Sequence, residues 1–467
     1  MNIFFRSIEV GGLENIPTER GGLLVAWHPN GMIDPALILG RFPYTLVFAA
    51  RHGLFQWPGL GSMMRSIGAV PMYRKRDLLH MPPTVREQKN QESLDSMSMA
   101  ISAGRFSAIF PEGVSHDSSF VRDLKLGAAR VYYRSRMFSA DGVPPVIIPV
   151  GLHYDKKHAF GSNVLVVFHP PISLPKELDI TPPDDEQDED KYAREVALTE
   201  HIEKVLTEVV LSTESWDLHF LFFRASKLIH AERAMRAGRL PSSPTMKEQV
   251  LGMARIWTGY QHRNQTHEPE LQVLRTDLSL YISHLDSMGI EDHQLDLEPD
   301  WLTFRIILQL AAHVCLLVFV LPPFLVLGYI INYPTAFILN QLAESLSERG
   351  KDIASVKTFG GVVLFPLTWL RWSLLSSWGY TQNVLDQMSS NHWAAFFLSF
   401  IFCVFSGLIV LNYTRFFRRT FLAIRLRFTK VSRSTQLARM RKQRSLLYDQ
   451  IIGLSQGLEL PEMDDFR

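Results

Sequence analysis

Short apolar runs bounded by turn residues alternate with longer mixed segments over residues 1–175. Segments 88–103 and 126–138 carry apolar side chains at helical spacing, whereas the short runs have the length of buried strands. The runs that we interpret as strands are residues 22–27, 44–49, 107–110, 146–151 and 164–168. Strands that alternate with helices predict an α/β domain, with helices packed on a mixed sheet.

The region that follows is mostly polar. Residues 175–191 are rich in proline and acids, which is typical of a surface linker. Residues 192–212 repeat apolar positions near the helical period and predict an amphipathic helix. Residues 213–300 have scattered apolar positions that favour helices, and they carry no motif that indicates a chemistry.

Long apolar runs mark the C-terminal third of the chain. Residues 306–331 contain no formally charged side chain over 26 positions, which is enough to cross a bilayer with some tilt. Residues 393–413 form a second uncharged run of spanning length. Residues 359–380 are also apolar, but Arg371 interrupts them. The sequence therefore predicts C-terminal transmembrane helices.

Charge is unevenly distributed, although the formal net charge is only +1. The overall balance therefore gives no reason to expect a nucleic acid partner. Residues 415–444, which follow the last apolar run, contain eleven Arg or Lys and no acid, as is typical of a solvated juxtamembrane tail. The positive-inside rule predicts that this basic tail is cytoplasmic.

The two cysteines, Cys315 and Cys403, both lie inside long apolar runs. This placement argues against a disulfide framework or a cysteine-based zinc site. The N-terminal residues include Arg6 and lack an apolar core of the length that a signal peptide needs.

His28 and Asp34 are the first candidate catalytic pair. His28 directly follows a predicted strand, and the Pro-Asn-Gly stretch after it is typical of a turn that brings the Asp34 carboxylate back to the imidazole. A neutral imidazole can then take a proton from an alcohol while the carboxylate orients the ring. An ordinary loop histidine is the alternative, because a chain with 16 histidines contains His–Asp pairs at many spacings.

A second group of residues has the chemistry to bind an anionic acceptor. Glu112 and Gly113 again follow a predicted strand; the carboxylate can orient a hydroxyl, and the glycine lets a ligand approach the backbone. Arg74 follows a small apolar stretch, and Lys125 follows the Glu-Gly turn. Arginine binds phosphate through two parallel hydrogen bonds. An ordinary turn and solvated surface charges are the alternative interpretations.

Four features in this order resemble the glycerolipid acyltransferase superfamily, whose catalytic domain is called PlsC-type. They are His28 with Asp34, Arg74 after residues 68–71, the Phe-Pro-Glu-Gly stretch at residues 110–113, and the apolar run at residues 146–151. Five residues separate His28 from Asp34, whereas the superfamily usually has four. The longer spacing resembles the glycerol-3-phosphate or dihydroxyacetone-phosphate acyltransferases best known from fungi, and residues 4–17 and 342–357 are similar to the same branch.

The resemblance implies a reaction and a role for each candidate. His28 would act as general base on an acceptor hydroxyl, Asp34 would orient His28, and the alcohol would attack the thioester of acyl-CoA directly. Arg74, Glu112 and Gly113 would hold the glycerol phosphate, with Lys125 as a further phosphate ligand. Acyl-CoA would be a co-substrate, and the resemblance implies no cofactor and no metal.

The predicted organisation has four parts. They are a PlsC-type acyltransferase domain (1–178), an acidic linker and helical region (179–300), a membrane region (301–414) and the basic tail (415–467). An acyl-CoA-using domain should be cytoplasmic like the tail, which requires an even number of crossings. We expect two spans, near residues 306–331 and 393–413, with residues 359–380 re-entrant or interfacial. Three spans would put domain and tail on opposite sides. The endoplasmic reticulum and a bacterial inner membrane both fit.

Several activities are compatible with these residues. The first is acyl transfer to the sn-1 hydroxyl of glycerol-3-phosphate, with dihydroxyacetone phosphate as a further acceptor. The alternatives are an sn-2 acyltransferase acting on lysophosphatidate, a CoA-independent phospholipid transacylase and an inactive membrane scaffold. The sequence has no G-x-S-x-G elbow, which argues against a serine lipase.

Overall fold

The computed structural model describes most of the chain. It leaves undescribed residues 1–3, 58, 75–79, 140–141, 184, 265–267, 298–307, 309–310, 313–314, 317–318, 320–321, 347–351, 384–391 and 463–467. The chain divides into two compact units. The first comprises Met1–Ser226, Pro244–Leu271 and Ile451–Arg467, and the second comprises Lys227–Ser243 and Gln272–Gln450.

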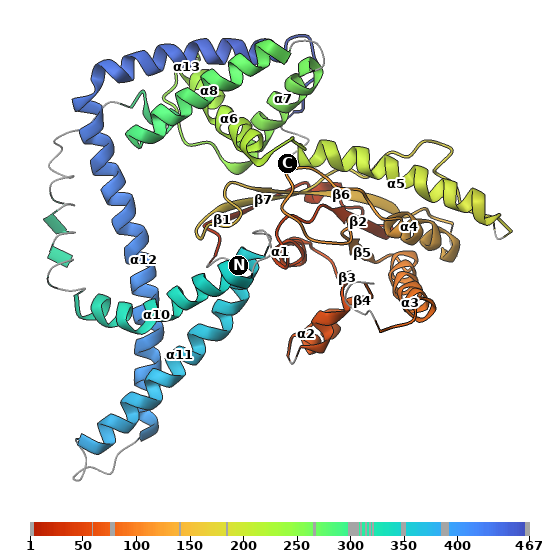
Figure 1. The fold of residues 1–467 in the computed structure, drawn as a ribbon, viewed down its shortest axis with the longest axis horizontal. Helices are drawn as coiled ribbons and strands as arrows, with labels where there is room; N and C mark the ends of the chain where they lie inside the picture. The colour runs from red at the N-terminus through yellow and green to blue at the C-terminus, as the bar shows by residue number, and fades with distance from the viewer. Residues whose placement is uncertain are drawn as a thin grey trace. The chain divides into compact units, whose positions relative to one another are not determined.

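The first unit is built on a seven-stranded sheet (Figure 1). Its strands are β1 (Ser7–Gly11), β2 (Gly22–Ala26), β3 (Leu46–Arg51), β4 (Val70–Met72), β5 (Phe106–Ile109), β6 (Val146–Tyr154) and β7 (Asn163–Phe168). The spatial order is β1-β7-β6-β2-β5-β3-β4. Every neighbouring pair is parallel except β6 and β7, so the sheet is mixed, as the sequence predicts.

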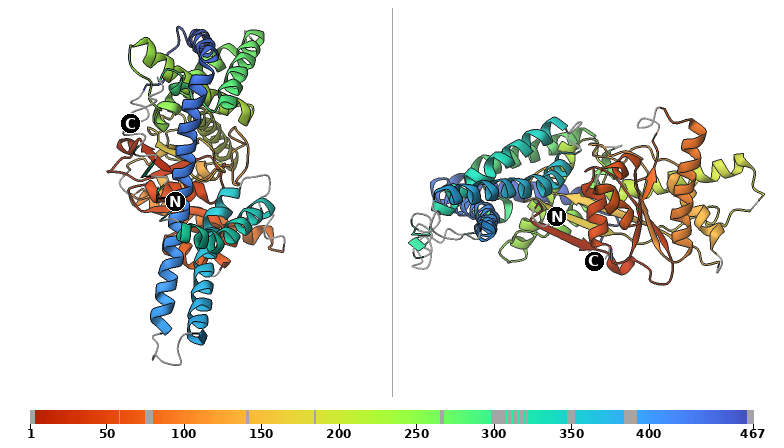
Figure 2. Two further views of the ribbon diagram at one scale, coloured as in Figure 1. Left: turned by 90° about the vertical axis from the view of Figure 1, so that its left-hand side faces the viewer. Right: turned by 90° about the horizontal axis from the view of Figure 1, so that it is seen from below.

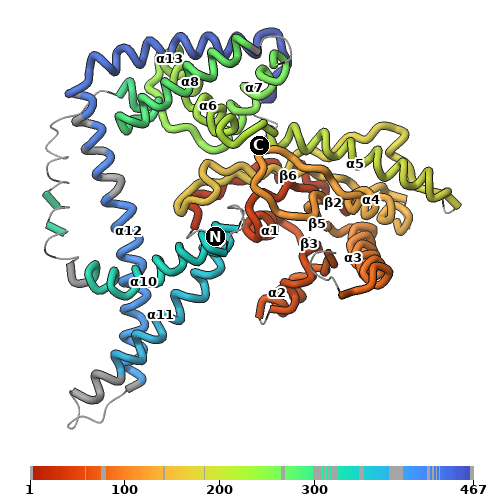
Figure 3. The backbone as a smooth tube through the Cα atoms, viewed as in Figure 1, coloured from red at the N-terminus to blue at the C-terminus, as the bar shows by residue number. Residues whose placement is uncertain are grey.

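Helices cover both faces of this sheet. On one face α3 (Pro83–Ser102), α4 (Gly127–Phe138) and α5 (Asp188–Val210) form a single buried core with the strands; it includes Leu23, Met97 and Ile202. The other face meets α1 (Ile33–Arg41), after which the ring of Phe42 contacts Phe106 and Phe168. Figure 3 traces the backbone from α4 through β6 and β7 to α5. The remaining helices are η1 (Leu13–Asn15), η2 (His52–Gln56), α2 (Leu60–Ser66), α6 (Trp216–Arg236) and α7 (Met246–Asn264).

Two strands of the sheet, β1 and β4, are not predicted from the sequence pattern. β1 alternates polar and apolar residues, and β4 is only three residues long with a proline at its centre. Both lie at the edges of the sheet, where a strand needs no continuous apolar run and proline is tolerated. The five predicted strands are all present. The carboxyl ends of the parallel strands β2, β3, β4, β5 and β6 lie along one edge of the sheet, the edge that runs across the strand ends. The candidate motifs follow these strand ends.

The second unit is helical. It contains η4 (Asp292–Gln294), α10 (Pro322–Leu346), α11 (Ile353–Asn383), α12 (His392–Ser432) and most of α8 (Glu268–Met288) and α13 (Ser434–Leu454). Among the described residues, three stretches are long and apolar enough to cross a membrane, by length and composition, which indicates membrane association: Phe324–Leu346, Ile353–Ser377 and Trp393–Phe417. α11 and α12 run side by side in opposite directions (Figures 1 and 2).

The apolar runs and the helices differ in their limits. Of the span expected at residues 306–331, most positions before 322 lie outside the described residues, and residues 322–331 belong to α10. Residues 359–380, expected to be re-entrant or interfacial, lie within α11 and belong in part to a stretch of spanning length.

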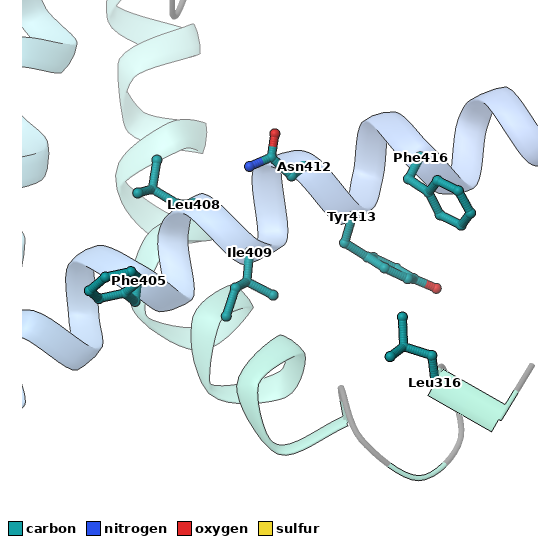
Figure 4. A pocket seen from close by; sticks show the side chains of 7 residues that line it. All are labelled: Leu316, Phe405, Leu408, Ile409, Asn412, Tyr413 and Phe416. Atoms are coloured by element: carbon teal, nitrogen blue, oxygen red, sulfur yellow. The ribbon is translucent and has the colours of Figure 1, made fainter. Parts of the chain in front are cut away.

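Polar side chains join α10 and α11. The indole Nε1 of Trp369 donates to Oδ1 of Asn332 at 2.8 Å, and the Thr335 and Thr368 hydroxyls are 2.7 Å apart. Such bonds specify how helices pack in lipid, where apolar contact alone does not discriminate. On another side, α12 forms a shallow apolar groove with Leu316 (Figure 4).

The basic residues 415–444 differ from a solvated tail. The described part of this region is helical, in α12 and α13. Arg444 is only 2% exposed; its guanidinium donates to Glu232 at 2.9 Å and to Asp296 at 2.7 Å. Arg441 donates to the carbonyl of Leu295. The distribution of charges along the sequence does not predict these ion pairs, because the acids that pair with Arg444 lie 148 and 212 positions earlier in the chain.

Candidate active site

The first candidate pair meets at the end of β2. His28 follows that strand, and α1 begins at Ile33, so Asp34 lies in the first helical turn. Nδ1 of His28 is 2.9 Å from Oδ2 of Asp34, and the two side chains are 13% and 0% exposed. Because a carboxylate only accepts, Nδ1 carries the proton and Nε2 is the basic atom. The Phe110 ring stacks on the imidazole with 4.1 Å between centroids.

Specific contacts hold the five-residue loop between His28 and Asp34. Gly31 adopts φ 47°, in the left-handed region that favours glycine. The backbone N–H of Asn30 donates to Oδ2 of Asp34 at 2.7 Å, and its side-chain amide donates to the Lys157 carbonyl at 3.2 Å. Nζ of Lys157 in turn donates to the Pro29 carbonyl at 3.3 Å. The loop is therefore held in place at Pro29 and Asn30.

Lys157 is a buried cation that the sequence analysis does not single out. Its ammonium pairs with Asp117 and lies 4.2 Å from the centroid of the Trp216 ring. Burial lowers the pKa of Lys157, and the Asp117 carboxylate partly offsets this effect. These partners come from three separate parts of the chain, and no local pattern links them.

Tyr154 completes the hydrogen bonds to Asp34. Its hydroxyl donates to Oδ1 at 2.5 Å, opposite the oxygen that binds His28 and Asn30. Burial and the nearby Asp34 charge raise the pKa of Tyr154 well above its usual value, so the hydroxyl keeps the proton that it donates. Tyr154 is the last residue of β6, the strand whose run predicts a position beside the site. That strand was the one available signal, but it does not name the tyrosine.

Glu112 lies at the centre of a buried network. Its Oε2 accepts from the His28 backbone N–H at 2.9 Å. Its Oε1 accepts from Nε2 of His116 at 2.7 Å and from the Arg122 N–H at 2.9 Å. Nδ1 of His116 accepts from the Ser118 N–H at 3.0 Å, so the proton of this imidazole is on Nε2. The Glu112 side chain is 0% exposed and ties the Glu-Gly turn to the strand end that carries His28.

Gly113 and Lys125 lie together beside this turn. Gly113 has φ 73°, and its N–H donates to the Phe110 carbonyl at 3.0 Å. The conformation alone accounts for a glycine at this position. The Lys125 N–H donates to the Pro111 carbonyl at 2.8 Å, and its exposed side chain passes the Gly113 α-carbon. The structure thus brings His28, Glu112, Gly113 and Lys125 to one edge.

Arg74 follows β4, at the same edge but three strand positions from β2. Strands lie about 4.8 Å apart, which separates the two strand ends by roughly 14 Å. Asn90 fixes the backbone of Tyr73, the residue before Arg74. The Tyr73 N–H donates to Oδ1 of Asn90, and Nδ2 of Asn90 donates to the Tyr73 carbonyl. Arg51, which ends β3 between these positions, is an exposed cation that the sequence pattern did not indicate.

Two buried histidines, His153 and His219, have perturbed protonation. Burial, with the nearby His169 and His219 as further causes, lowers the pKa of His153 to about 3. Burial and the charge of Lys157 lower the pKa of His219 to about 4. Both imidazoles are therefore neutral at physiological pH.

Comparison with known proteins gives matches over both parts of the chain. Residues 7–153 match the family described as Acyltransferase, and residues 230–463 match the family described as Glycerol-3-phosphate acyltransferase 2 C-terminal domain. The chain is 25% identical to an uncharacterized acyltransferase of Schizosaccharomyces pombe, over 82% of this chain and 65% of the relative. It is 27% identical to glycerol-3-phosphate O-acyltransferase 1 of Saccharomyces cerevisiae, over 40% of this chain and 23% of the relative.

A solved structure is also similar. It is the crystal structure of PlsC, the 1-acyl-sn-glycerophosphate acyltransferase of Thermotoga maritima, with 20% identity over 44% of this chain and 73% of that chain and a TM-score of 0.29. The chain spans less than two thirds of the length of either curated relative. The second family match, however, covers half of the chain. The protein therefore belongs to the glycerolipid acyltransferases that carry the glycerol-3-phosphate acyltransferase 2 C-terminal domain.

Proposed function

We propose that the protein transfers a fatty acyl group from acyl-CoA to the sn-1 hydroxyl of glycerol-3-phosphate, with dihydroxyacetone phosphate as a further acceptor. The observation that carries the proposal is the His28–Asp34 pair, whose geometry leaves Nε2 as a base at the strand edge. The C-terminal family match and the Saccharomyces cerevisiae relative support glycerol-3-phosphate as the acceptor.

The proposed reaction needs only one basic atom. Nε2 of His28 takes the proton of the acceptor hydroxyl as its oxygen attacks the thioester carbonyl, and Asp34 stabilises the imidazolium that forms. The tetrahedral intermediate then collapses, the C–S bond breaks, and the imidazolium returns the proton to the leaving thiolate. The products are lysophosphatidate and free CoA, and no acyl-enzyme is formed.

The acceptor phosphate is proposed to bind between the cations at the same edge. Arg74 and Lys125 are the expected ligands, and Arg51 adds a third cation. For Glu112 we propose a positioning role, because the three hydrogen bonds it accepts all come from the protein. Gly113 keeps the turn tight enough for an acceptor to lie along it.

The test uses membranes that contain the protein, with labelled palmitoyl-CoA and either glycerol-3-phosphate or lysophosphatidate. We expect lysophosphatidate from the first acceptor, and a loss of about 10²–10⁴-fold in His28→Ala because the general base is gone. His80→Ala, at an exposed histidine, is the control. Phosphatidate formed only from lysophosphatidate would identify an sn-2 enzyme, and His28-dependent transfer without acyl-CoA would identify a transacylase. Activity that survives in His28→Ala would refute the mechanism.

We further propose that the chain enters and leaves the membrane on the cytoplasmic side. Residues before the apolar helices pack on residues after them: Arg425 donates to the carbonyl of Ser287 at 3.3 Å, and Arg441 to that of Leu295 at 2.7 Å. Direct hydrogen bonds cannot bridge a hydrocarbon core about 30 Å thick. The number of full crossings is therefore even, as an acyl-CoA-using domain and a cytoplasmic tail require.

Of the three helices of spanning length among the described residues, we propose that two make the crossings. α11 and α12 are the better pair, because they pack antiparallel and Ser376 in α11 bonds to Ser399 in α12. The stretch in α10 also has lower mean hydropathy, 1.2 against 1.5 and 2.6. Thus α11, rather than the run at residues 306–331, is proposed as the partner of α12.

Single cysteines in a Cys315→Ala, Cys403→Ala background can locate the two sides. In sealed vesicles, an impermeant maleimide should label Ser345→Cys and Arg433→Cys from the same side and Trp393→Cys from the other. Labelling of Trp393→Cys and Arg433→Cys from one side would contradict the arrangement, whatever the activity.

A further inference from the structure

Residues 44–76 form an unusual stretch of the catalytic unit. They contain five Arg or Lys and not one Asp or Glu. Residues 52–57 and 59–67 of this stretch, which we name the η2–α2 knob, lie between β3 and β4 and include η2 and α2. No residue of the knob has a role in the proposed reaction.

The knob exposes large apolar side chains. Trp57 is 63% exposed and Met63 is 49% exposed. Further apolar residues of the knob are partly exposed: Leu54, Phe55, Leu60, Met64 and Ile67. Single exposed apolar residues are common, but a group of this size with a tryptophan marks an interaction surface.

These side chains are held outward by an ordered backbone. The N–H of Gly61 donates to the Trp57 carbonyl at 2.9 Å, and the N–H of Met63 donates to the Gly59 carbonyl at 3.0 Å. A Cβ at Gly61 would lie 2.1 Å from the Phe55 carbonyl oxygen, so only glycine allows η2 and α2 to pack this closely. The apolar residues are therefore fixed in place and do not collapse onto the sheet.

The base of the knob lies where the carboxyl ends of the parallel strands meet, on the side of the sheet that carries His28 and Glu112. Arg51 ends β3, which pairs with β5, the strand that leads to Glu112. The imidazole of His52 stacks on the Tyr73 ring with 4.5 Å between centroids. The knob thus leaves the sheet on the same edge that carries His28.

We propose that the η2–α2 knob inserts into the surface of an anionic lipid bilayer. Tryptophan favours the membrane interface, and apolar side chains beside cations without acids are what an interfacial anchor needs. Arg65 is exposed in the knob and would meet lipid phosphates. The same chain carries helices of spanning length, which bring a bilayer within reach.

The contact gives an acyl chain a short path between the lipid and His28. This consequence rests on the proposed function, whereas insertion of the knob does not. An acidic protein could also meet the cations, but it would not immerse the knob in hydrocarbon. Immersion is therefore the property to measure.

The test places an environment-sensitive NBD label on the full chain in phosphatidylcholine nanodiscs with phosphatidylglycerol. The parent carries Cys315→Ala and Cys403→Ala, and the label is attached at Ser62→Cys in α2, which leaves Trp57 and Met63 intact. The matched control is Ser96→Cys, at another exposed serine, in helix α3. We expect blue-shifted emission at position 62 that brominated acyl chains quench, and neither effect at position 96.

Two further outcomes are decisive. Trp57→Ser should weaken the quenching at position 62, and so should omission of phosphatidylglycerol. A blue shift without quenching by brominated lipid would mean that protein covers the knob, either another part of this chain or a second copy, and would overturn the proposal. Emission at position 62 that matches position 96 would also overturn it.

Activity separates this inference from the proposed reaction. Trp57→Ser with Met63→Ser should reduce transfer from palmitoyl-CoA several-fold and leave transfer from a short, water-soluble acyl-CoA unchanged. Equal losses with both donors would contradict a role in delivering acyl chains. Absence of any acyl transfer in the parent would refute the proposed function and leave the quenching result to decide insertion alone.

Discussion

Replacement of Glu112 by glutamine tests whether this residue binds substrate or positions the base. The two side chains have the same shape, so the change leaves packing intact. The carboxylate accepts three hydrogen bonds, from the His28 and Arg122 backbones and from His116. The amide offers one accepting oxygen and a nitrogen that only donates. In either orientation at least one of the three donors therefore faces another donor.

The magnitude follows from the burial of the site. An unsatisfied buried donor costs about 1–3 kcal/mol, and the remaining bonds lose the strength that a charged acceptor gives them. The free energy of unfolding of the catalytic unit should fall by about 3 kcal/mol. For a domain of this size, that lowers the midpoint of thermal unfolding by about 6–12 °C. kcat should fall as well, because the backbone of His28 loses its anchor.

The assay compares wild type, Glu112→Gln and Glu87→Gln in detergent–lipid micelles. Glu87 is an exposed residue of α3, and its substitution should change neither property. Residual acyl transfer after heating gives the apparent midpoint, and initial rates give kcat and KM. If Glu112 contacts the acceptor directly, KM for the acceptor should rise and the midpoint should stay within about 1 °C of wild type. That result would refute the positioning role.

Three further changes test other parts of the structure. Tyr154→Phe removes one bond to the catalytic carboxylate, and kcat should fall about tenfold with little change in KM, for a loss of about 1–2 kcal/mol; a change confined to KM would contradict the assignment. The pKa of His153 in the folded protein is about 3, below the usual 6.5. As the pH falls below 6.5, the unfolded chain therefore binds a proton that the folded chain does not, and the free energy of unfolding decreases toward pH 3. At pH 5 this costs about 2 kcal/mol, and His153→Gln should flatten the fall in thermal midpoint between pH 7 and 5, unlike the exposed control His80→Gln. Arg444→Met leaves two buried carboxylates facing each other and should destabilise the helical unit by about 3–5 kcal/mol, measured as loss of helical circular dichroism on heating, whereas Arg439→Met, at an exposed arginine, should be neutral.

The sequence predicts the sheet well because its central strands are continuous apolar runs. Their carboxyl ends meet at one edge, so the order of motifs along the chain is enough to bring His28 and Glu112 together. Edge strands such as β4 lack that signal, because a strand with one neighbour does not need two apolar faces.

The residues that hold the catalytic pair could not be predicted from local patterns. Tyr154 lies 120 positions from Asp34, and Lys157 lies 128 positions from Pro29. His116 resembles any loop histidine until its two ring nitrogens are seen bound to Glu112 and Ser118. Each of these contacts depends on which strand lies next to which. That information is absent from the spacing of residues along one segment.

The longer spacing between His28 and Asp34 has a physical explanation in these contacts. One more residue in a buried loop adds a backbone N–H and a carbonyl, and each must find a partner. Asp34 itself accepts the Asn30 N–H, and Lys157 donates to the Pro29 carbonyl. Burial of the Lys157 ammonium is costly, but the Asp117 carboxylate and the Trp216 ring offset much of that cost. These contacts fix the loop at Pro29 and Asn30, and the carboxylate that orients the base is held through both oxygens.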